Sequence, residues 1–248
     1  MRQVFYSSTL TEEIVITGGD AHHLAHVMRT QIGDVITVVD AEGQAAEMVV
    51  TALTRDAVHF RMQRVLPAET AGREVILVQA LLKGEKMDFI VQKAAELGAV
   101  CMRPIVTEHV VVRYDAKKAA AKAARWQKIA DEAAKQCGRR SLMTVAPIVS
   151  LAELLQDPAY IGAADTVTVF CYEQEERQSM RTVLRGTEAR RVTLIVGAEG
   201  GFSPAEAAAL TAAGGQSVSL GHRILRAETA SLTALAVTQY EMGNLGIL

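Results

Sequence analysis

The sequence predicts two domains, a small all-β domain followed by a larger α/β domain with a mainly parallel sheet. Residues 1–66 consist of short extended runs broken by turn residues. Pro67–Arg73 then combines Pro, Gly and small polar residues, a composition typical of a linker. From Glu74 onward strand-like and helix-like segments alternate, which indicates parallel strands joined by helices. We therefore place the β domain at residues 1–70 and the α/β domain at residues 74–248.

The first domain is expected to be a small β-barrel or sheet. A helical stretch over Asp20–Thr30 precedes two extended runs, Val35–Val39 and Ala45–Val50, which the turn-like insert Asp40–Gly43 separates. Ala57–Val65 alternates apolar and polar side chains, and this period of two predicts a half-buried strand.

The second domain begins with Val75–Leu82, a near-continuous apolar run typical of a strand buried on both faces. Glu85–Leu97 repeats apolar side chains at helical spacing and ends before Gly98, which predicts an amphipathic helix. Its other face carries Phe89 and Lys93 and is either a contact surface or an ordinary solvated surface. Further strands are expected at Val100–Val106, Thr166–Tyr172, Thr193–Val196 and Gln216–Leu220, and further helices at Lys117–Gln136, Pro204–Ala213 and Glu228–Met242.

Composition argues against several classes of protein. Among 248 residues, 26 Lys and Arg nearly balance 28 Asp and Glu, and the net charge of −2 argues against a partner held by bulk charge. Three widely spaced cysteines without a C-x-x-C pair argue against a disulfide scaffold or a thiolate zinc site. No segment has the roughly 18 apolar residues that span a bilayer, and the start has no signal-peptide core. We expect a cytoplasmic protein without membrane contact.

The common nucleotide and hydrolase motifs are absent from the sequence. It contains no P-loop, no G-x-G-x-x-G after a strand and no G-x-S-x-G elbow. His22 and His26 have the spacing of two metal ligands on a helix, but no nearby Asp or Glu completes a zincin-like set. Ordinary surface histidines are the favoured interpretation, and no metal site is expected.

The segment Thr193–Glu206 predicts a strand, a tight glycine loop and a helix. Three glycines interrupt the apolar strand, and Ser203–Glu206 has the form of a capping box with Pro at the first helical position. Glycines let a ligand approach the backbone closely, and ligands of open α/β sheets lie at the carboxyl ends of strands. The alternative is a tight strand-to-helix connection without a ligand.

A second loop, Leu220–Ala230, follows another expected strand. Gly221 permits a turn, the apolar pair Ile224 and Leu225 stands between two arginines, and Glu228 opens a helix. This mixture suits an aromatic ligand with polar ends, because apolar side chains can pack on a ring while backbone groups bind its edge. Two exposed arginines capped by Glu228 are the alternative.

Four sequence motifs follow one another along the chain. They are KGEKMDFIVQKAAELG at Lys83–Gly98, RWQKI with EAAKQ between residues 125 and 136, GAEGGFSPAE at Gly197–Glu206, and LGHRILRAETA at Leu220–Ala230. Together they resemble the ribosomal RNA small subunit methyltransferase E family, which belongs to the SPOUT class of RNA methyltransferases. The start, His23–Arg29 followed by a Gly-Asp turn, is also similar, so the resemblance covers nearly the whole chain.

The resemblance implies a PUA-like, RNA-binding β domain and an α/β domain with a deep trefoil knot, in a homodimer. The mostly apolar circumference of the last helix is consistent with an interface. It also implies S-adenosylmethionine as methyl donor, held in a bent conformation by the two loops. The implied donor-binding residues are Gly197, Glu199, Gly200, Gly201, Leu220, Gly221, Ile224, Leu225, Arg226, Thr229 and Ala230.

The chain departs from the family pattern at four positions. Ala198 stands where Pro is common, Ala95 and Ala227 where Thr is common, and Cys137 where Ser is frequent. None of these departures removes a charged group, so we expect activity to be retained.

The implied reaction is methylation of N3 of a uridine in 16S ribosomal RNA of the small subunit. N3 carries a proton at neutral pH, so the site must assist deprotonation or stabilise the uracil anion. We expect Arg226 to stabilise the anion, and Glu228 or Glu199 to be a weaker candidate for the base. The alternatives are a non-catalytic RNA-binding or ribosome-assembly protein on the same scaffold, and a TIM-barrel enzyme, which the β-type start disfavours.

Positive charge is concentrated locally. The window Arg113–Arg140 holds nine basic and three acidic residues, a net charge of +6, whereas residues 1–70 carry −4. A basic helical face in this window is a plausible phosphate-contact stripe, although most charge runs are solvated surface. The expected RNA-contacting residues are Arg2, Arg29, Lys86, Lys93, Lys118, Lys122 and Arg125.

Overall fold

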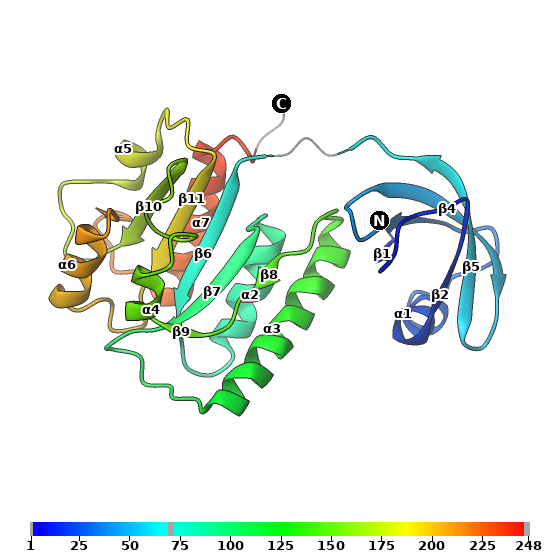
Figure 1. Cartoon of the computed structure of the whole chain (residues 1–248), viewed down its shortest axis with the longest axis horizontal. Helices are drawn as coiled ribbons and strands as arrows, with labels where there is room; N and C mark the ends of the chain where they lie inside the picture. Colours follow the sequence, from blue (N-terminus) through cyan, green and yellow to red (C-terminus); the bar gives the residue numbers. More distant parts are fainter. Residues whose placement is uncertain (1, 69–71, 246–248) are drawn as a thin grey trace. The chain divides into compact units, whose positions relative to one another are not determined.

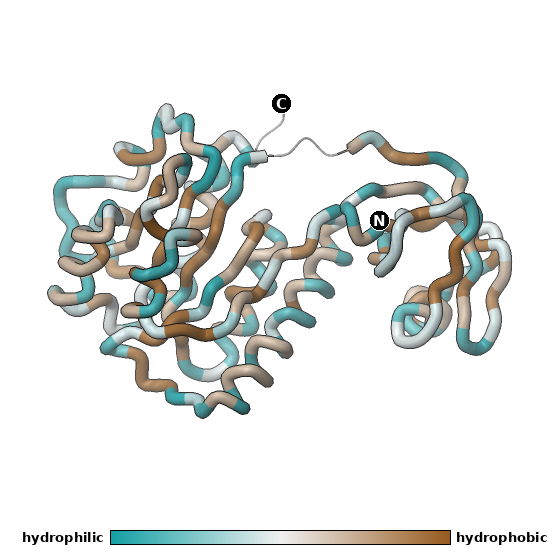
Figure 2. Tube along the Cα trace, viewed as in Figure 1, coloured by the Kyte–Doolittle hydropathy of each residue, from teal (hydrophilic) through white to brown (hydrophobic). Residues whose placement is uncertain are grey.

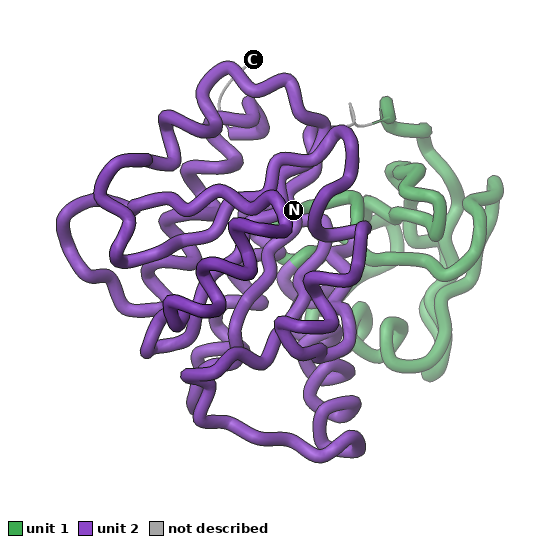
Figure 3. Tube along the Cα trace, turned by 60° about the vertical axis from the view of Figure 1, so that its left-hand side comes forward, with its two compact units in different colours: residues 1–71, 134–141 green, residues 72–133, 142–248 purple. Residues whose placement is uncertain are grey.

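The computed structural model describes residues 2–68 and 72–245. The chain forms two compact units: unit 1 comprises residues 1–71 and 134–141, and unit 2 comprises residues 72–133 and 142–248 (Figure 3). Residues 134–141 follow the expected β domain by more than sixty positions in the sequence but group with it. Lys135 Nζ lies 2.9 Å from Asp20 Oδ1, and Gln3 Nε2 donates to the Arg139 carbonyl at 2.6 Å.

Unit 1 contains a five-stranded sheet in the order β1-β3-β4-β5-β2. All neighbouring strands are antiparallel except β1 and β3. The alternation predicted for β5 is confirmed, because Val58 and Phe60 are buried and Arg61 is exposed. The elements are β1 (Gln3–Phe5), β2 (Glu13–Thr17), α1 (Gly18–His22), η1 (His23–Val27, one turn of π-helix), β3 (Val35–Val39), β4 (Ala45–Leu53) and β5 (Ala57–Val65).

Unit 2 alternates strands and helices as the sequence predicts. Four short elements were not predicted, because two to five residues are too few for periodicity to show: β8, β9, α4 and α5. The elements are β6 (Glu74–Ala80), α2 (Lys86–Glu96), β7 (Cys101–Val106), α3 (Ala116–Cys137), β8 (Thr144–Val145), β9 (Val149–Ser150), α4 (Leu151–Leu155), β10 (Thr166–Cys171), α5 (Met180–Leu184), β11 (Arg191–Val196), α6 (Pro204–Ala212), β12 (Gln216–Val218) and α7 (Ala227–Glu241).

The sheet of unit 2 is wholly parallel and has the order β12-β10-β11-β6-β7-β8, with β9 also paired to β7 (Figure 1). The predicted burial of the first strand on both faces is confirmed, since Val75, Leu77 and Val78 are fully buried. Figure 2 shows hydrophobic residues concentrated along these strands. The sheet therefore forms the centre of the larger core.

Helix α7 covers the middle of the sheet. It packs on β6 and β11, and α2 and α5 contact it. Gln239 of α7 is buried and donates from Nε2 to the Leu97 carbonyl at the end of α2, at 2.8 Å. Because the strands are parallel, the carboxyl ends of β10, β11 and β12 meet at one edge of the sheet beside the start of α7. Among the described residues, no helix is both long and apolar enough to cross a membrane.

Candidate functional site

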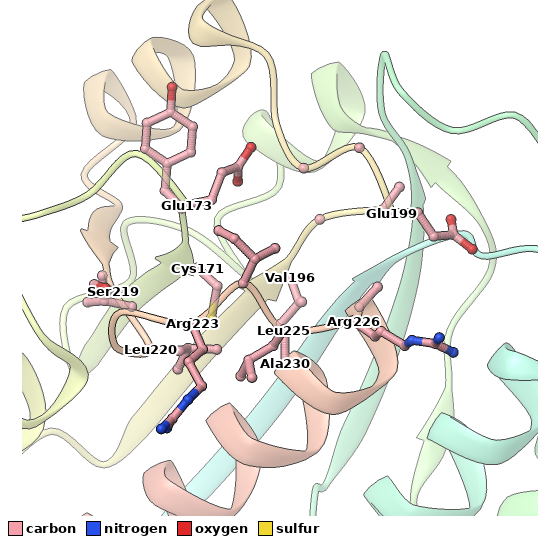
Figure 4. Close-up of a pocket in the computed structure, with 18 of the residues that line it drawn as sticks. Cys171, Glu173, Val196, Glu199, Ser219, Leu220, Arg223, Leu225, Arg226 and Ala230 are labelled. Carbon is pink, nitrogen blue, oxygen red and sulfur yellow. The ribbon is translucent and has the colours of Figure 1, made fainter.

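A cavity of about 540 Å³ opens at the carboxyl ends of β10, β11 and β12 (Figure 4). Its walls are three loops, residues 171–173, 196–201 and 218–227, together with one turn of α7 and one side chain of α2. This volume lies within the range typical of sites for small organic ligands. The lining residues are Lys86, Cys171, Tyr172, Glu173, Val196, Gly197, Ala198, Glu199, Gly200, Gly201, Val218, Ser219, Leu220, Gly221, Arg223, Ile224, Leu225, Arg226, Ala227 and Ala230.

The glycine loop after β11 has no room for side chains at three positions. A Cβ on Gly197 would lie 3.1 Å from the backbone carbonyl carbon of Gly201, and one on Gly200 would lie 3.0 Å from the Cβ of His109. Gly201 has a φ of 66° and faces the Glu173 carboxylate, with which an added Cβ would collide. The three glycines thus form a narrow backbone cradle on one wall of the cavity.

Two features anchor the far side of this loop. Phe202 is buried and packs edge-to-face on Phe170 of β10, with ring centroids 6.1 Å apart. Ser203 caps α6, and the predicted capping box with Glu206 is confirmed. Glu206 also accepts a hydrogen bond from the backbone N–H of Glu108 at 2.7 Å, which links the glycine loop to the segment after β7.

A buried polar network lies behind the loop. Gln79 is completely buried in β6, and its Nε2 donates to the Gly197 carbonyl at 3.3 Å and to the Ala80 carbonyl at 3.0 Å. Ser231 of α7 donates to Gln79 Oε1. A buried amide that satisfies its neighbours restricts their positions, so the network ties β6, α7 and the start of the glycine loop together.

The second loop presents apolar and cationic side chains together. Gly221 has a φ of 111°, which permits the turn after β12. Ile224 is 84% exposed and Leu225 is half-buried at the cavity. Arg226 occupies the N-cap position of α7, and its guanidinium makes no hydrogen bond or ion pair with a described residue. In Figure 4 Arg226 and Glu199 lie on one side of the cavity, whereas Arg223 points to the other.

A cluster of charged side chains lies on the same side of the cavity as Arg226. Lys86 Nζ donates to Glu199 Oε1 at 3.1 Å and lies 3.4 Å from Glu228 Oε2, a buried oxygen that accepts no hydrogen bond from a described residue. The hydrogen bond to Glu199 raises the pKa of Lys86, so it remains cationic. Partial burial raises the pKa of Glu199, but the hydrogen bonds from Lys86 and from backbone N–H groups outweigh it, and the pKa lies below its usual value. Glu199 is therefore ionised at neutral pH and is a weak base.

The cavity brings together ten of the eleven residues expected to bind the donor. The exception is Thr229, because the helical turn that directs Ala230 into the cavity leaves Thr229 exposed on α7. Glu228 is also outside the lining and reaches the site only through Lys86.

The residues expected to contact RNA are scattered, and four of the seven are ion-paired. The pairs are Arg2 with Asp34, Lys86 with Glu199 and Glu228, Lys93 with Glu96, and Arg125 with Asp88. Lys118 lies over the Tyr114 ring, 5.3 Å from its centroid. Arg29 is exposed with a φ of 49°, and Lys122 is partly exposed on α3.

Sequence reasoning missed the contribution of the loop after β10. Cys171, Tyr172 and Glu173 line the cavity, and the one available signal was their position at the carboxyl end of a predicted strand. Burial raises the pKa of Cys171 to about 12, so its thiol is protonated and is not a nucleophile. Among residues 2–68 and 72–245, no three His, Cys, Asp or Glu side chains are grouped as a metal site.

The family model for an RNA methyltransferase domain matches residues 69–239, and one for an RNA methyltransferase PUA domain matches residues 16–63. The ribosomal RNA small subunit methyltransferase E of Bacillus subtilis is 33% identical over 237 residues, which cover 91% of this chain and 89% of that protein.

Solved structures agree with the sequence comparison. The Neisseria gonorrhoeae ribosomal RNA small subunit methyltransferase E, bound to S-adenosyl methionine, has a TM-score of 0.85 and 28% identity, and the match covers 96% of this chain and 97% of that chain. A Legionella pneumophila methyltransferase in complex with the same cofactor has a TM-score of 0.84 and 27% identity, with 96% of both chains covered. The chain therefore belongs to the ribosomal RNA small subunit methyltransferase E family of RNA methyltransferases.

Proposed function

We propose that this chain methylates N3 of a uridine in the 16S RNA of the small ribosomal subunit. It is an S-adenosylmethionine-dependent ribosomal RNA methyltransferase. The observation that carries the proposal is the glycine-walled cavity at the strand ends, which lies inside the segment that matches the RNA methyltransferase domain. To this activity the proposal adds the identity of the target base, a uridine, and of the methylated atom, N3.

The cavity suits S-adenosylmethionine in size and in the chemistry of its walls. The side chains of Leu220, Leu225 and Ala230 offer apolar surface against which an adenine ring packs. Gly197 and Gly201 leave the backbone open to a polar ligand, and Glu173 contributes a carboxylate for hydroxyl or ammonium groups. We propose that these residues hold the donor.

The bound donor supplies an electrophilic methyl group on a sulfonium. The new N–C bond forms as the C–S bond breaks with its electron pair left on sulfur, and the N3 proton passes to a base or to water. The guanidinium of Arg226 lies on the cavity wall without a partner among the described residues, and we propose that it stabilises the uracil anion. The lowered pKa of Glu199 makes it a poor proton acceptor, and Glu228 stands behind Lys86, so the base stays unassigned.

We also propose a trefoil knot in unit 2, a homodimer and a cytoplasmic location. Support for the knot comes from the chain path: after β12, at the edge of the sheet, the chain returns as α7 to pack on β6 and β11. Support for the dimer comes from apolar side chains that unit 2 leaves exposed, Tyr240 at 68% and Ile224 at 84%.

Unit 1 is proposed to help bind the RNA. Its match to a PUA domain of RNA methyltransferases supports this role. Residues 1–70 carry a net charge of −4, but Lys135, Arg139 and Arg140 bring unit 1 close to neutral. Arg2 and Arg29 are the candidates that the sequence offered for phosphate contact.

Mass mapping of 16S RNA from cells with and without the protein tests the function. We expect N3-methyluridine at one position to disappear when the protein is absent and to return when the gene is supplied again. Unchanged N3-methyluridine would overturn the proposal. Failure of the purified protein to bind S-adenosylmethionine by calorimetry would favour the non-catalytic RNA-binding alternative.

The glycine cradle predicts a loss of donor affinity in Gly201→Ala. The new Cβ strains the left-handed backbone and displaces the Glu173 carboxylate from the wall. We expect the donor Kd, measured by calorimetry, to rise about tenfold, or about 1.4 kcal/mol.

Gly186→Ala is the matched control, because Gly186 has a φ of 73°, open space around its Cβ position and no place in the cavity. It should place the same left-handed strain on the backbone without a change in Kd. Equal Kd values for the two variants would contradict the prediction.

A further inference from the structure

A second cavity lies against the outer side of the glycine loop. Its volume is about 640 Å³, and it is lined by Lys83, Lys86, His109, Val111, Glu199 and Gly200. Lys86, Glu199 and Gly200 also line the donor cavity, so the two cavities share a wall. We propose that this second cavity binds the acceptor nucleotide, with the pyrimidine against His109 and Val111 and a neighbouring phosphate on Lys83. The inference rests on the proposed function.

The shared wall is the first argument. Direct methyl transfer requires the acceptor nitrogen to approach the methyl carbon opposite to the departing sulfur, so donor and acceptor sites must adjoin. The two linings share Lys86, Glu199 and Gly200, so the second cavity adjoins the donor cavity at the glycine loop. A base that reaches such a pocket must leave any helical stack, because stacking and pairing would cover N3.

The charges of the lining are the second argument. Lys86 is held by Glu199 and Glu228, so its ammonium is neutralised within the wall. Among the described residues, the Lys83 ammonium has no hydrogen-bond or ion-pair partner, and its side chain is exposed at the cavity. A free ammonium at the mouth of a nucleotide-sized pocket suits a phosphate of the RNA backbone.

The third argument is the surface formed by His109 and Val111. The ring of His109 is fixed, because Nδ1 lies 2.6 Å from the Gly200 carbonyl oxygen. A carbonyl oxygen only accepts, so Nδ1 carries the proton and Nε2 is left for another partner. Val111 is 68% exposed, so its apolar side chain is accessible at the cavity. A fixed aromatic ring and an exposed apolar side chain form a surface on which a base can stack.

Steady-state kinetics with 16S RNA at saturating S-adenosylmethionine tests the site. For Lys83→Ala we expect KM for RNA to rise about tenfold, with kcat within threefold and donor Kd within twofold of the wild type. The slope of log KM against log salt concentration should fall by about one, which a merely structural lysine would not cause. Lys83→Arg should restore KM. Arg185→Ala, which removes an exposed cation at the end of α5, should leave KM within twofold of the wild type.

A cross-linking experiment tests the position of the base. An RNA with a single 4-thiouridine at the methylated position should cross-link to the peptide that contains His109 and Val111. Suppose that the wild type methylates RNA. If Lys83→Ala then leaves KM and the salt slope unchanged, or if the cross-link lies outside the cavity lining, the acceptor site is wrong but the proposed function stands. If the wild type transfers no methyl group to RNA, both fail.

Discussion

Replacing Arg226 by Ala should lower kcat for methylation about 10²- to 10³-fold at saturating S-adenosylmethionine, as expected when one preorganised donor to a developing anion is removed. Its guanidinium lies on the wall of the donor cavity, on the same side as Glu199, which lines both cavities, and no carboxylate of a described residue neutralises it. The full positive charge is therefore available to an acceptor base that loses its proton. We expect the donor Kd to change far less than kcat, because the anion forms after the donor binds.

Three comparisons make the Arg226 experiment decisive. Arg226→Lys keeps the charge but not the planar fork of donors, so its kcat should fall between the wild type and Arg226→Ala. Arg181→Ala, on the exposed surface of α5, removes one charge outside the cavity and should keep kcat within twofold. A rise in the pH at which the rate reaches half its maximum should accompany Arg226→Ala, because the N3 proton becomes harder to remove. Near-normal kcat in Arg226→Ala would eliminate the assignment.

The second large effect concerns stability. Phe202→Ala should lower the free energy of unfolding by about 3–5 kcal/mol, the usual cost of deleting a buried aromatic ring. Phe202 is 1% exposed and meets Phe170 edge-to-face, so little of the space it leaves can be refilled. Chemical denaturation followed by circular dichroism measures the loss.

Phe202 directly follows the glycine loop, so its loss should also weaken donor binding in the folded fraction. Phe89→Ala is the matched control, because Phe89 is 44% exposed on α2 and lines neither cavity. It should change stability by less than about 1 kcal/mol. If the two variants unfold at the same denaturant concentration, Phe202 does not anchor the glycine loop.

Local patterns predicted the larger helices and strands, because the apolar spacing that identifies each of them lies within one continuous segment of the sequence. The apolar run of β6 and the helical spacing of α2 could be identified without knowing which elements pack against them. The glycine cradle was also predictable, since Gly197, Gly200 and Gly201 follow an apolar strand and precede a capping box.

The features that sequence analysis could not supply depend on contacts between distant residues. Lys86 pairs with Glu199, 113 positions away, and no local pattern distinguishes such a lysine from one that is free for RNA. The buried contact of Gln79 with Ser231 spans 152 positions. Glu173 lies against Gly201 only because β10 and β11 are neighbours in the sheet. The proposed knot was implied by resemblance alone, because a knot is a property of the whole chain path and of no local pattern.

The order of the strands also has a consequence for biosynthesis. The central strand β6 leaves the ribosome early, but the helix that covers it, α7, is made after β12, near the end of the chain. Until α7 emerges, the apolar surface of β6 and β11 lacks part of its cover, and folding must wait for contacts between the two ends of unit 2. Nascent chains that stall before residue 227 should therefore be recognised by chaperones, and the enzyme should gain its ligand site only once α7 has emerged.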